Sequence, residues 1–250
     1  MGPFAVFGVL ALLSSHVYAH WTFCNFLVNG TETEQWRYVR DVAQEDGTFA
    51  DSPMAGKSFP QQGLEIYSTN ITCGRSAIQS ASRTETATVL AGSEVGFRVN
   101  DNGTIFHPGV TQFYMAAVPS GKRIEEFAGN EDDARWFKVA SLGAKSDTEW
   151  ITHESRDANF TVPKTTPPGQ YLLRIEHLWP QRSASGPQWY VNCAQVQVVG
   201  PGGGAPEEFA RFPGTYEVAD PGIWLQDGER GDPQINLLRY VPPGPKVWLG

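Results

Sequence analysis

The chain has 250 residues, a formal net charge of −8, and 26 glycines and 18 prolines. An acidic balance argues against nucleic acid and anionic membranes as partners, because both select a basic face. Frequent turn residues and scarce helical periodicity predict an all-β fold, and this length suits one such domain.

An apolar leader opens the chain. Residues 4–13 are continuously apolar, but this run is too short to cross a bilayer. Val17 and Ala19 supply the small residues at −3 and −1 that signal peptidase prefers. We predict a signal peptide over residues 1–19 and a secreted, extracellular mature chain that begins at His20; a buried helix is the alternative.

Short apolar or alternating runs separated by turns follow the leader, a pattern typical of a sandwich or barrel. A first strand at 21–28 precedes a long ordered loop at 31–62. The runs at 84–90 and 95–100 flank Ala91-Gly92-Ser93-Glu94, a hairpin-like signal. Further strands are expected at 110–118, 135–140, 149–151, 159–162, 170–179 and 188–199, with one helical turn within 131–137 as an alternative.

A Gly-rich stretch at 200–204 follows the last strand. It resembles a linker, but only 46 residues follow it and none is Cys. A separate domain that small usually needs disulfides or a metal. We therefore expect one domain over 20–250, with 205–250 as a tail wrapped on the core and no separate carbohydrate-binding module.

Three cysteines and four glycosylation sequons fit secretion. We expect Cys73 to pair with Cys193, which would close a long loop, and Cys24 to remain a buried thiol. With Gln188 and Tyr190 on one face of the last strand, Cys193 should point to the other face, into the sandwich. The candidate N-glycosylation sites are Asn29, Asn70, Asn102 and Asn159.

An N-terminal histidine carries two nitrogen donors, its α-amine and its imidazole. His107, extended by Pro108 in front of a strand, would add a third nitrogen to His20. Three nitrogens in a plane suit Cu(II), whereas zinc prefers a tetrahedral set. A phenol from Tyr190 could sit on the open axis and Gln188 could donate a hydrogen bond. His153 and His177 are interpreted as structural. The candidate site residues are therefore His20, His107, Gln188 and Tyr190.

Several segments then match one family in order across the mature chain. The chain resembles the fungal lytic polysaccharide monooxygenases of auxiliary activity family nine, which oxidise cellulose. The matching segments are His20-Trp-Thr-Phe, Val28-Asn29-Gly30, Thr72-Cys73-Gly74, His107-Pro108-Gly109, Gln112-Phe113-Tyr114, Trp136-Phe137-Lys138, 169–176, 188–195, Phe212-Pro-Gly-Thr-Tyr216, 220–223 and 240–245.

The resemblance implies an immunoglobulin- or fibronectin-like β-sandwich with long loops and few short helices. It implies one copper ion held by His20 and His107, with Tyr190 as the axial group and Gln188 beside it. It also implies the Cys73–Cys193 disulfide and a sugar-stacking role for Tyr240. The expected partners are cellulose or a related β-glucan, O2 or H2O2, and an electron donor; the expected state is a monomer.

One segment departs from the family pattern. A histidine common in the family is matched here by Arg182, within Gln181-Arg182-Ser183-Ala184. Arg182 can donate hydrogen bonds and hold positive charge at the site, but its pKa above about 12 prevents proton exchange near neutrality. The leading hypothesis is a copper monooxygenase acting at C1 and/or C4. The alternatives are a copper-binding protein with weak or no oxidative activity, and a carbohydrate-binding sandwich.

Overall fold

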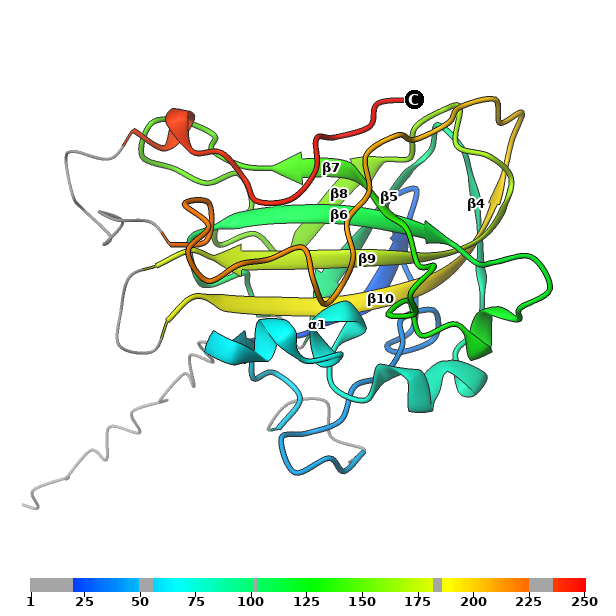
Figure 1. Ribbon diagram of the computed structural model, residues 1–250, viewed down its shortest axis with the longest axis horizontal. Helices are drawn as coiled ribbons and strands as arrows, with labels where there is room; N and C mark the ends of the chain where they lie inside the picture. Colours follow the sequence, from blue (N-terminus) through cyan, green and yellow to red (C-terminus); the bar gives the residue numbers. More distant parts are fainter. Residues whose placement is uncertain (1–19, 50–55, 101–102, 182–185, 225–235) are drawn as a thin grey trace, which may run out of the picture.

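The computed structural model describes residues 20–49, 56–100, 103–181, 186–224 and 236–250. Two β-sheets pack face to face, and the larger sheet lies in front in Figure 1. The predicted all-β sandwich with few short helices is confirmed. In the part of the chain that is described, no helix is both long and apolar enough to cross a bilayer.

The strands are short except for two that run through the larger sheet. The smaller sheet has the order β2-β1-β5-β8, and the larger has β3-β10-β9-β6-β7 with β4 beside β10. Their bounds are β1 Phe23–Val28, β2 Thr31–Glu32, β3 Gln61–Gln62, β4 Ala87–Leu90, β5 Glu94–Val99, β6 Val110–Ala117, β7 Trp136–Leu142, β8 Asp157–Thr161, β9 Gly169–Trp179 and β10 Gln188–Val199.

Helical segments are confined to single turns or little more. They lie mainly between β3 and β4, below β10 in Figure 1. Their bounds are α1 Asn70–Cys73 and the 3-10 segments η1 Gly63–Tyr67, η2 Ala77–Arg83, η3 Ile124–Glu126 and η4 Leu237–Arg239.

The antiparallel pair β9 and β10 is buried on both faces. Tyr190, Ala194 and Val196 of β10 pack into the core between the two sheets. Trp189 and Cys193 alternate with them and pack into a second core on the outer side. This double burial explains why apolar residues occur on both faces of these strands. Most of the polar side chains among them are buried too, and Arg174 and Glu176 satisfy each other by an ion pair.

Cys193 therefore does not point into the sandwich, and that part of the prediction is wrong. It forms the expected disulfide with Cys73 at the end of α1, on the outer side of β10. A sheet covered on one side by helical turns offers a buried place for a disulfide on either face. Cys24 is a buried thiol whose sulfur accepts a hydrogen bond from Gln35 Nε2.

The hairpin expected across residues 91–94 is also wrong. β4 runs parallel to β10 in the larger sheet, whereas β5 pairs with β1 and β8 in the smaller sheet. Gly92, at φ +92°, turns the chain from one sheet to the other. Ala87 and Val89 bury against the same core as β5, so the apolar pattern could not distinguish the two arrangements.

The strand expected at 149–151 is reduced to one isolated bridge between Ala144 and Trp150. Trp150 is buried while Ile151 is exposed. One anchored side chain in a turn is sufficient to give this segment its apolar signal.

The described parts of the tail lie against the larger sheet, with 205–224 crossing its front and 236–250 following its β7 edge (Figure 1). Ala210 bridges to Trp136, and Lys138 Nζ donates to the Pro243 carbonyl at 2.8 Å. These bonds fix both ends of the tail on the sheet that carries the candidate site.

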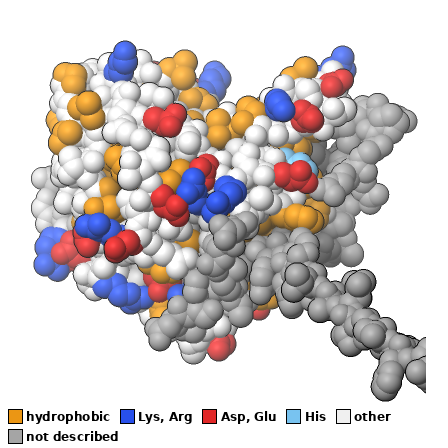
Figure 2. Space-filling model, turned by 180° about the vertical axis from the view of Figure 1, so that it is seen from behind, with side chains coloured by type: hydrophobic (Ala, Val, Ile, Leu, Met, Phe, Trp, Pro, Cys, Tyr) orange, Lys and Arg blue, Asp and Glu red, His pale blue; other side chains and the backbone are white. Residues whose placement is uncertain are grey.

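The outer side of the smaller sheet is polar. Figure 2 shows acidic and basic side chains interspersed on this side of the molecule. Arg98 of β5 bonds there to Asp157 of β8 and to Glu32 of β2, which joins three strands. Arg98 and Asp157 are half-buried and joined by two parallel bonds, so this network contributes more to stability than an isolated exposed ion pair, which adds about 1 kcal/mol or less.

Candidate metal centre

His20 and His107 come together at one end of the sandwich. His20 lies three residues before β1 and His107 three residues before β6, and their ring centroids are 5.9 Å apart. His20 is half-buried, whereas His107 is buried. Burial lowers the pKa of His20, an effect that Glu45 partly opposes. Burial therefore favours the neutral form of the His20 imidazole, which is the form that can donate a nitrogen lone pair.

Gly109 allows the turn after His107 to lie close to β9. A Cβ atom added at Gly109 would lie 2.0 Å from the carbonyl oxygen of Leu178. Only glycine allows this approach. His177 reinforces it, because its Nε2 lies 3.0 Å from the His107 carbonyl oxygen.

The tautomer of His177 follows from its partners. A carbonyl can only accept, so Nε2 carries the proton and Nδ1 accepts from the Thr111 hydroxyl at 2.9 Å. Complete burial lowers the pKa of His177 to about 3. His153 lies on a neighbouring loop and donates from Nε2 to the carbonyl of Phe106.

The ring spacing fits one shared metal ion. A metal–imidazole bond of about 2 Å places an ion roughly 3 Å from a ring centroid, so two rings on one ion lie at most about 6 Å apart. The observed 5.9 Å satisfies this limit. Among the described residues, no group of three His, Cys, Asp or Glu side chains could hold a metal. The donor set available from His20 and His107 is therefore imidazole nitrogen plus the His20 amine when that amine is free.

Tyr190 completes the cluster. Its ring centroid lies 6.3 Å from that of His20 and 6.1 Å from that of His107. Its hydroxyl donates to Gln188 Oε1 at 2.8 Å, as expected for two residues on one face of β10. Burial raises the pKa of Tyr190 well above its usual value, so the group is a neutral phenol.

Two tryptophans support the cluster, and neither was singled out from the sequence. Trp179 stacks on His107 and Trp21 stacks on Tyr190, each with centroids 3.8 Å apart and ring planes within 7°. Trp21 adjoins His20 in sequence, and Trp179 pairs with Gln188 across β9 and β10. Strand register places Trp179, and register cannot be read from one apolar run.

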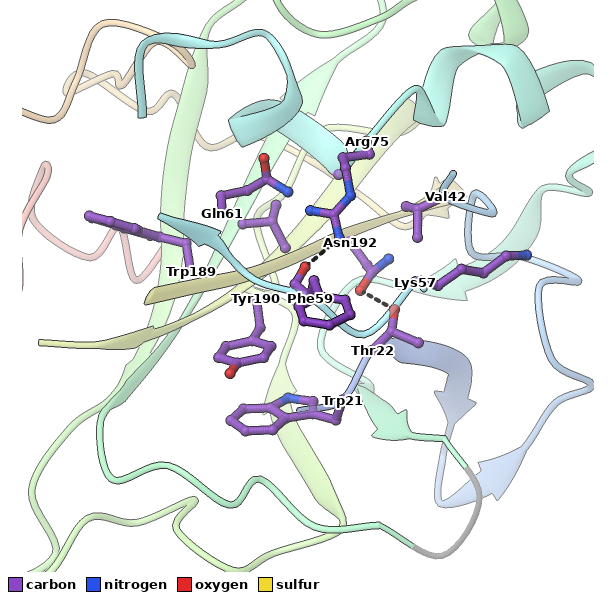
Figure 3. A pocket seen from close by; sticks show the side chains of 12 residues that line it. Trp21, Thr22, Val42, Lys57, Phe59, Gln61, Arg75, Trp189, Tyr190 and Asn192 are labelled. Atoms are coloured by element: carbon purple, nitrogen blue, oxygen red, sulfur yellow. Dashed lines mark hydrogen bonds between the residues drawn. The ribbon is translucent and has the colours of Figure 1, made fainter. Parts of the chain in front are cut away.

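Asn192 fixes the approach of the N-terminal segment to β10. Its Oδ1 accepts from the Phe23 backbone N–H at 3.0 Å and from the Thr22 hydroxyl at 3.1 Å. Figure 3 shows the bond from the Thr22 hydroxyl to Asn192 and, next to it, the bond from Arg75 to the Phe59 carbonyl. Phe59 is 39 % exposed and its ring lies 5.3 Å from that of His20. The bond from Arg75 thus helps to hold the partly exposed Phe59 ring beside His20.

The contacts of Tyr240 are with Trp150 and Gly222, not with the rings of this cluster. The Tyr240 ring packs edge-to-face on Trp150 with centroids 5.0 Å apart, and its hydroxyl donates to the Gly222 carbonyl. Arg182 lies outside the described residues, as does Asn102. Of the other sequons, Asn29 is exposed, while Asn70 and Asn159 are half-buried.

Fold and site together define a β-sandwich protein that carries two imidazoles and a phenol at one end of its sheets. The model of Auxiliary Activity family 9 (formerly GH61) matches residues 20–232, and the chain belongs to this family. This membership confirms the family predicted from the sequence and the predicted class, a copper-dependent oxidoreductase.

The similarity extends over nearly the whole chain. AA9 family lytic polysaccharide monooxygenase U of Thermothielavioides terrestris is 48 % identical, with 96 % of each chain covered. AA9 family lytic polysaccharide monooxygenase C of Emericella nidulans is 37 % identical over 96 % of this chain and 95 % of its own. Among solved structures, Cel61B from Hypocrea jecorina, a glycoside hydrolase family 61 member, has a TM-score of 0.71 at 23 % identity; it covers 92 % of this chain and 100 % of its own, and supports the fold.

Proposed function

We propose that the protein is a secreted copper monooxygenase that cleaves β-1,4-glucan such as cellulose by oxidation at C1, C4 or both. It would act as a monomer with one copper ion, O2 or H2O2, and an external electron donor. The observation that carries the proposal is the facing pair His20 and His107 with Tyr190 beside it.

Three nitrogens would hold the ion after removal of residues 1–19. They are the His20 amine, the His20 imidazole and the His107 imidazole, a set that suits the tetragonal preference of Cu(II). Bound copper would supply one-electron chemistry and an open coordination position. Tyr190 would place a neutral phenol beside the ion, which adds no charge to the site.

The protein's own groups would orient and shield this centre. Gln188 holds the Tyr190 hydroxyl through Oε1, which leaves its Nε2 group as the donor toward an oxygen co-substrate. Trp21 covers one face of the phenol and excludes water from it. If Arg182 takes the place of the family histidine that it matches in sequence, it would add a second donor and a positive charge.

A neutral glucan suits this surface. A net charge of −8 gives no attraction for an anionic polymer. Phe59 presents part of its ring beside His20, where the apolar face of a sugar could stack. We also propose Tyr240 as a substrate contact on the tail side.

The decisive test is product analysis of the copper-loaded mature protein. The mass of its N-terminal peptide must show that the chain begins at His20, since one further residue would turn the amine into an amide. Incubation with cellulose and a reductant should release oxidised oligosaccharides, and the position of oxidation reports C1 or C4.

Variants make this test specific. His107→Ala should abolish both the type-2 copper spectrum and the products, whereas His153→Gln should retain both, because His153 Nε2 donates to the Phe106 carbonyl and a glutamine amide can replace that bond. Copper binding without oxidised products from any β-glucan would contradict the monooxygenase. It would support the copper-binding alternative, and Arg182→His would then be the variant to restore turnover.

A further inference from the structure

The face-to-face contact between Trp179 and His107 is distinct from the other ring contacts of this histidine. Its centroids are 3.8 Å apart and its planes 7° apart. Within the described chain, the rings of Trp21, Phe106 and Tyr190 lie 5.4 to 6.1 Å from His107 and are inclined by 37° or more. Trp179 alone among these four covers a face of the imidazole.

One short stretch of β9 fixes both the backbone and the ring of His107. His177 donates to the His107 carbonyl, Leu178 packs its carbonyl against Gly109, and Trp179 stacks on the ring. The register of β9 against β10, with Trp179 opposite Gln188, holds this stretch in place. The imidazole plane is therefore set by a strand and not by a loop, which favours precise geometry.

Core packing is a poor explanation for Trp179. The ring is half-buried at the open end of the sheet, unlike Trp21 and Trp136, which are nearly or fully buried. A smaller apolar residue at this strand end would expose less apolar surface to water than the indole does. The placement makes sense if the indole acts on the imidazole that it covers.

We propose that Trp179 is a positioning residue that fixes the plane of the His107 imidazole and favours the more highly charged state of the metal bound there. The inference rests on the proposed copper site. An imidazole that donates its lone pair to a cation becomes electron-poor, and the negative face of an indole stabilises such a ring. Because this attraction grows with the charge on the ion, Trp179 should stabilise Cu(II) more than Cu(I).

Two variants test the proposal in the mature protein. Trp179→Leu removes the π face and keeps apolar bulk, and it should weaken Cu(II) binding about two- to tenfold in chelator competition. Cu(I) affinity should change less, and the hyperfine splitting of the Cu(II) EPR spectrum should shift. Trp179→Phe should restore most of the Cu(II) affinity and the spectrum, because a benzene ring also offers a negative face.

Trp248→Leu is the matched control. Trp248 is also half-buried, but it packs edge-to-face on Phe137 in the tail, so its replacement should leave both affinities and the spectrum unchanged. Unchanged spectra and affinities in Trp179→Leu would overturn the inference alone, as would equal losses for Cu(I) and Cu(II). Absence of a type-2 copper signal from the unaltered protein would overturn the proposed function and this inference together.

Discussion

At the scale of single residues, burial determines which groups near the site carry charge. His177 is fully buried between Trp21 and the turn of His107, and its pKa is lowered to about 3. It therefore stays neutral in the folded protein at pH values where a solvent-exposed histidine is protonated. Its neutral form is also the form that its two hydrogen bonds require, because Nδ1 must accept from Thr111.

This burial predicts a pH dependence of stability. The unfolded chain binds a proton at His177 below pH 6.5, whereas the folded chain does not until about pH 3. The contribution of this residue to the free energy of unfolding is therefore fully present above pH 6.5 and decreases as the pH falls. Between pH 6.5 and 4.5 the loss from this residue should be about 2 kcal/mol. Urea unfolding at the two pH values should show that loss in the unaltered protein and a smaller one in His177→Gln.

Thr111→Val is the matched control for that measurement. It removes the hydrogen bond to Nδ1 but leaves the imidazole buried, so it should lower stability at both pH values and keep the pH dependence. An equal pH dependence in His177→Gln and the unaltered protein would contradict the buried neutral histidine.

At the scale of elements, the sequence predicts those whose signal is local. β10 begins and ends at the predicted residues, and β9 and β6 differ from prediction by one residue at one end. The hairpin between β4 and β5 fails because sheet membership depends on partners far away in the chain. The same reason hides Trp179 from sequence reasoning, since its contact with His107 depends on the register of β9 against β6 and β10. By contrast, the residues of the proposed copper site carry local signals: a cleavage pattern before His20, a His-Pro-Gly turn at His107, and a period of two for Gln188 and Tyr190.

The tail is an element whose attachment can be tested. Lys138 is buried and donates to the Pro243 carbonyl, and its backbone carbonyl accepts from the Trp248 N–H. Lys138→Met keeps the aliphatic stem but leaves the Pro243 carbonyl without this donor, at a cost of about 1–3 kcal/mol. The Trp248 amide should then exchange with deuterium at least about fivefold faster, while β9 and β10 keep their protection.

Lys145→Met is the control for the tail. This exposed side chain pairs with Glu149 at the surface, and its removal should leave exchange at Trp248 unchanged. Equal protection of Trp248 in Lys138→Met and the unaltered protein would show that the tail is held by its other contacts.

At the scale of the whole molecule, two cores share one sheet. The inter-sheet core holds Tyr190 and the outer core holds Cys193, three residues further along β10. The face with the candidate site and the face with the disulfide are therefore opposite sides of one strand. Contacts that keep β10 in place therefore stabilise the fold and the positions of Gln188 and Tyr190 together.

The disulfide is the clearest case of such a whole-molecule effect. Cys73 and Cys193 are 120 residues apart, and a loop of that length restricts the unfolded chain by about 4–5 kcal/mol in the chain-entropy account. The double variant Cys73→Ala/Cys193→Ala should lose most of that amount in urea unfolding, a large share of the 5–15 kcal/mol typical of a folded domain. The folded fraction should still bind copper with an unaltered EPR spectrum, because Tyr190 and the paired strands do not depend on the sulfur atoms.

Cys24→Ala separates the disulfide from the general effect of removing a sulfur. Cys24 is equally buried but is not disulfide-bonded, so its replacement should cost only about 1 kcal/mol, from the small cavity left behind. A double variant no less stable than Cys24→Ala would show that the unfolded chain gains little freedom when the bridge is absent. In that case the sheet pairing of β9 and β10, not the bridge, would be the main constraint that keeps the strand of Gln188 and Tyr190 in place.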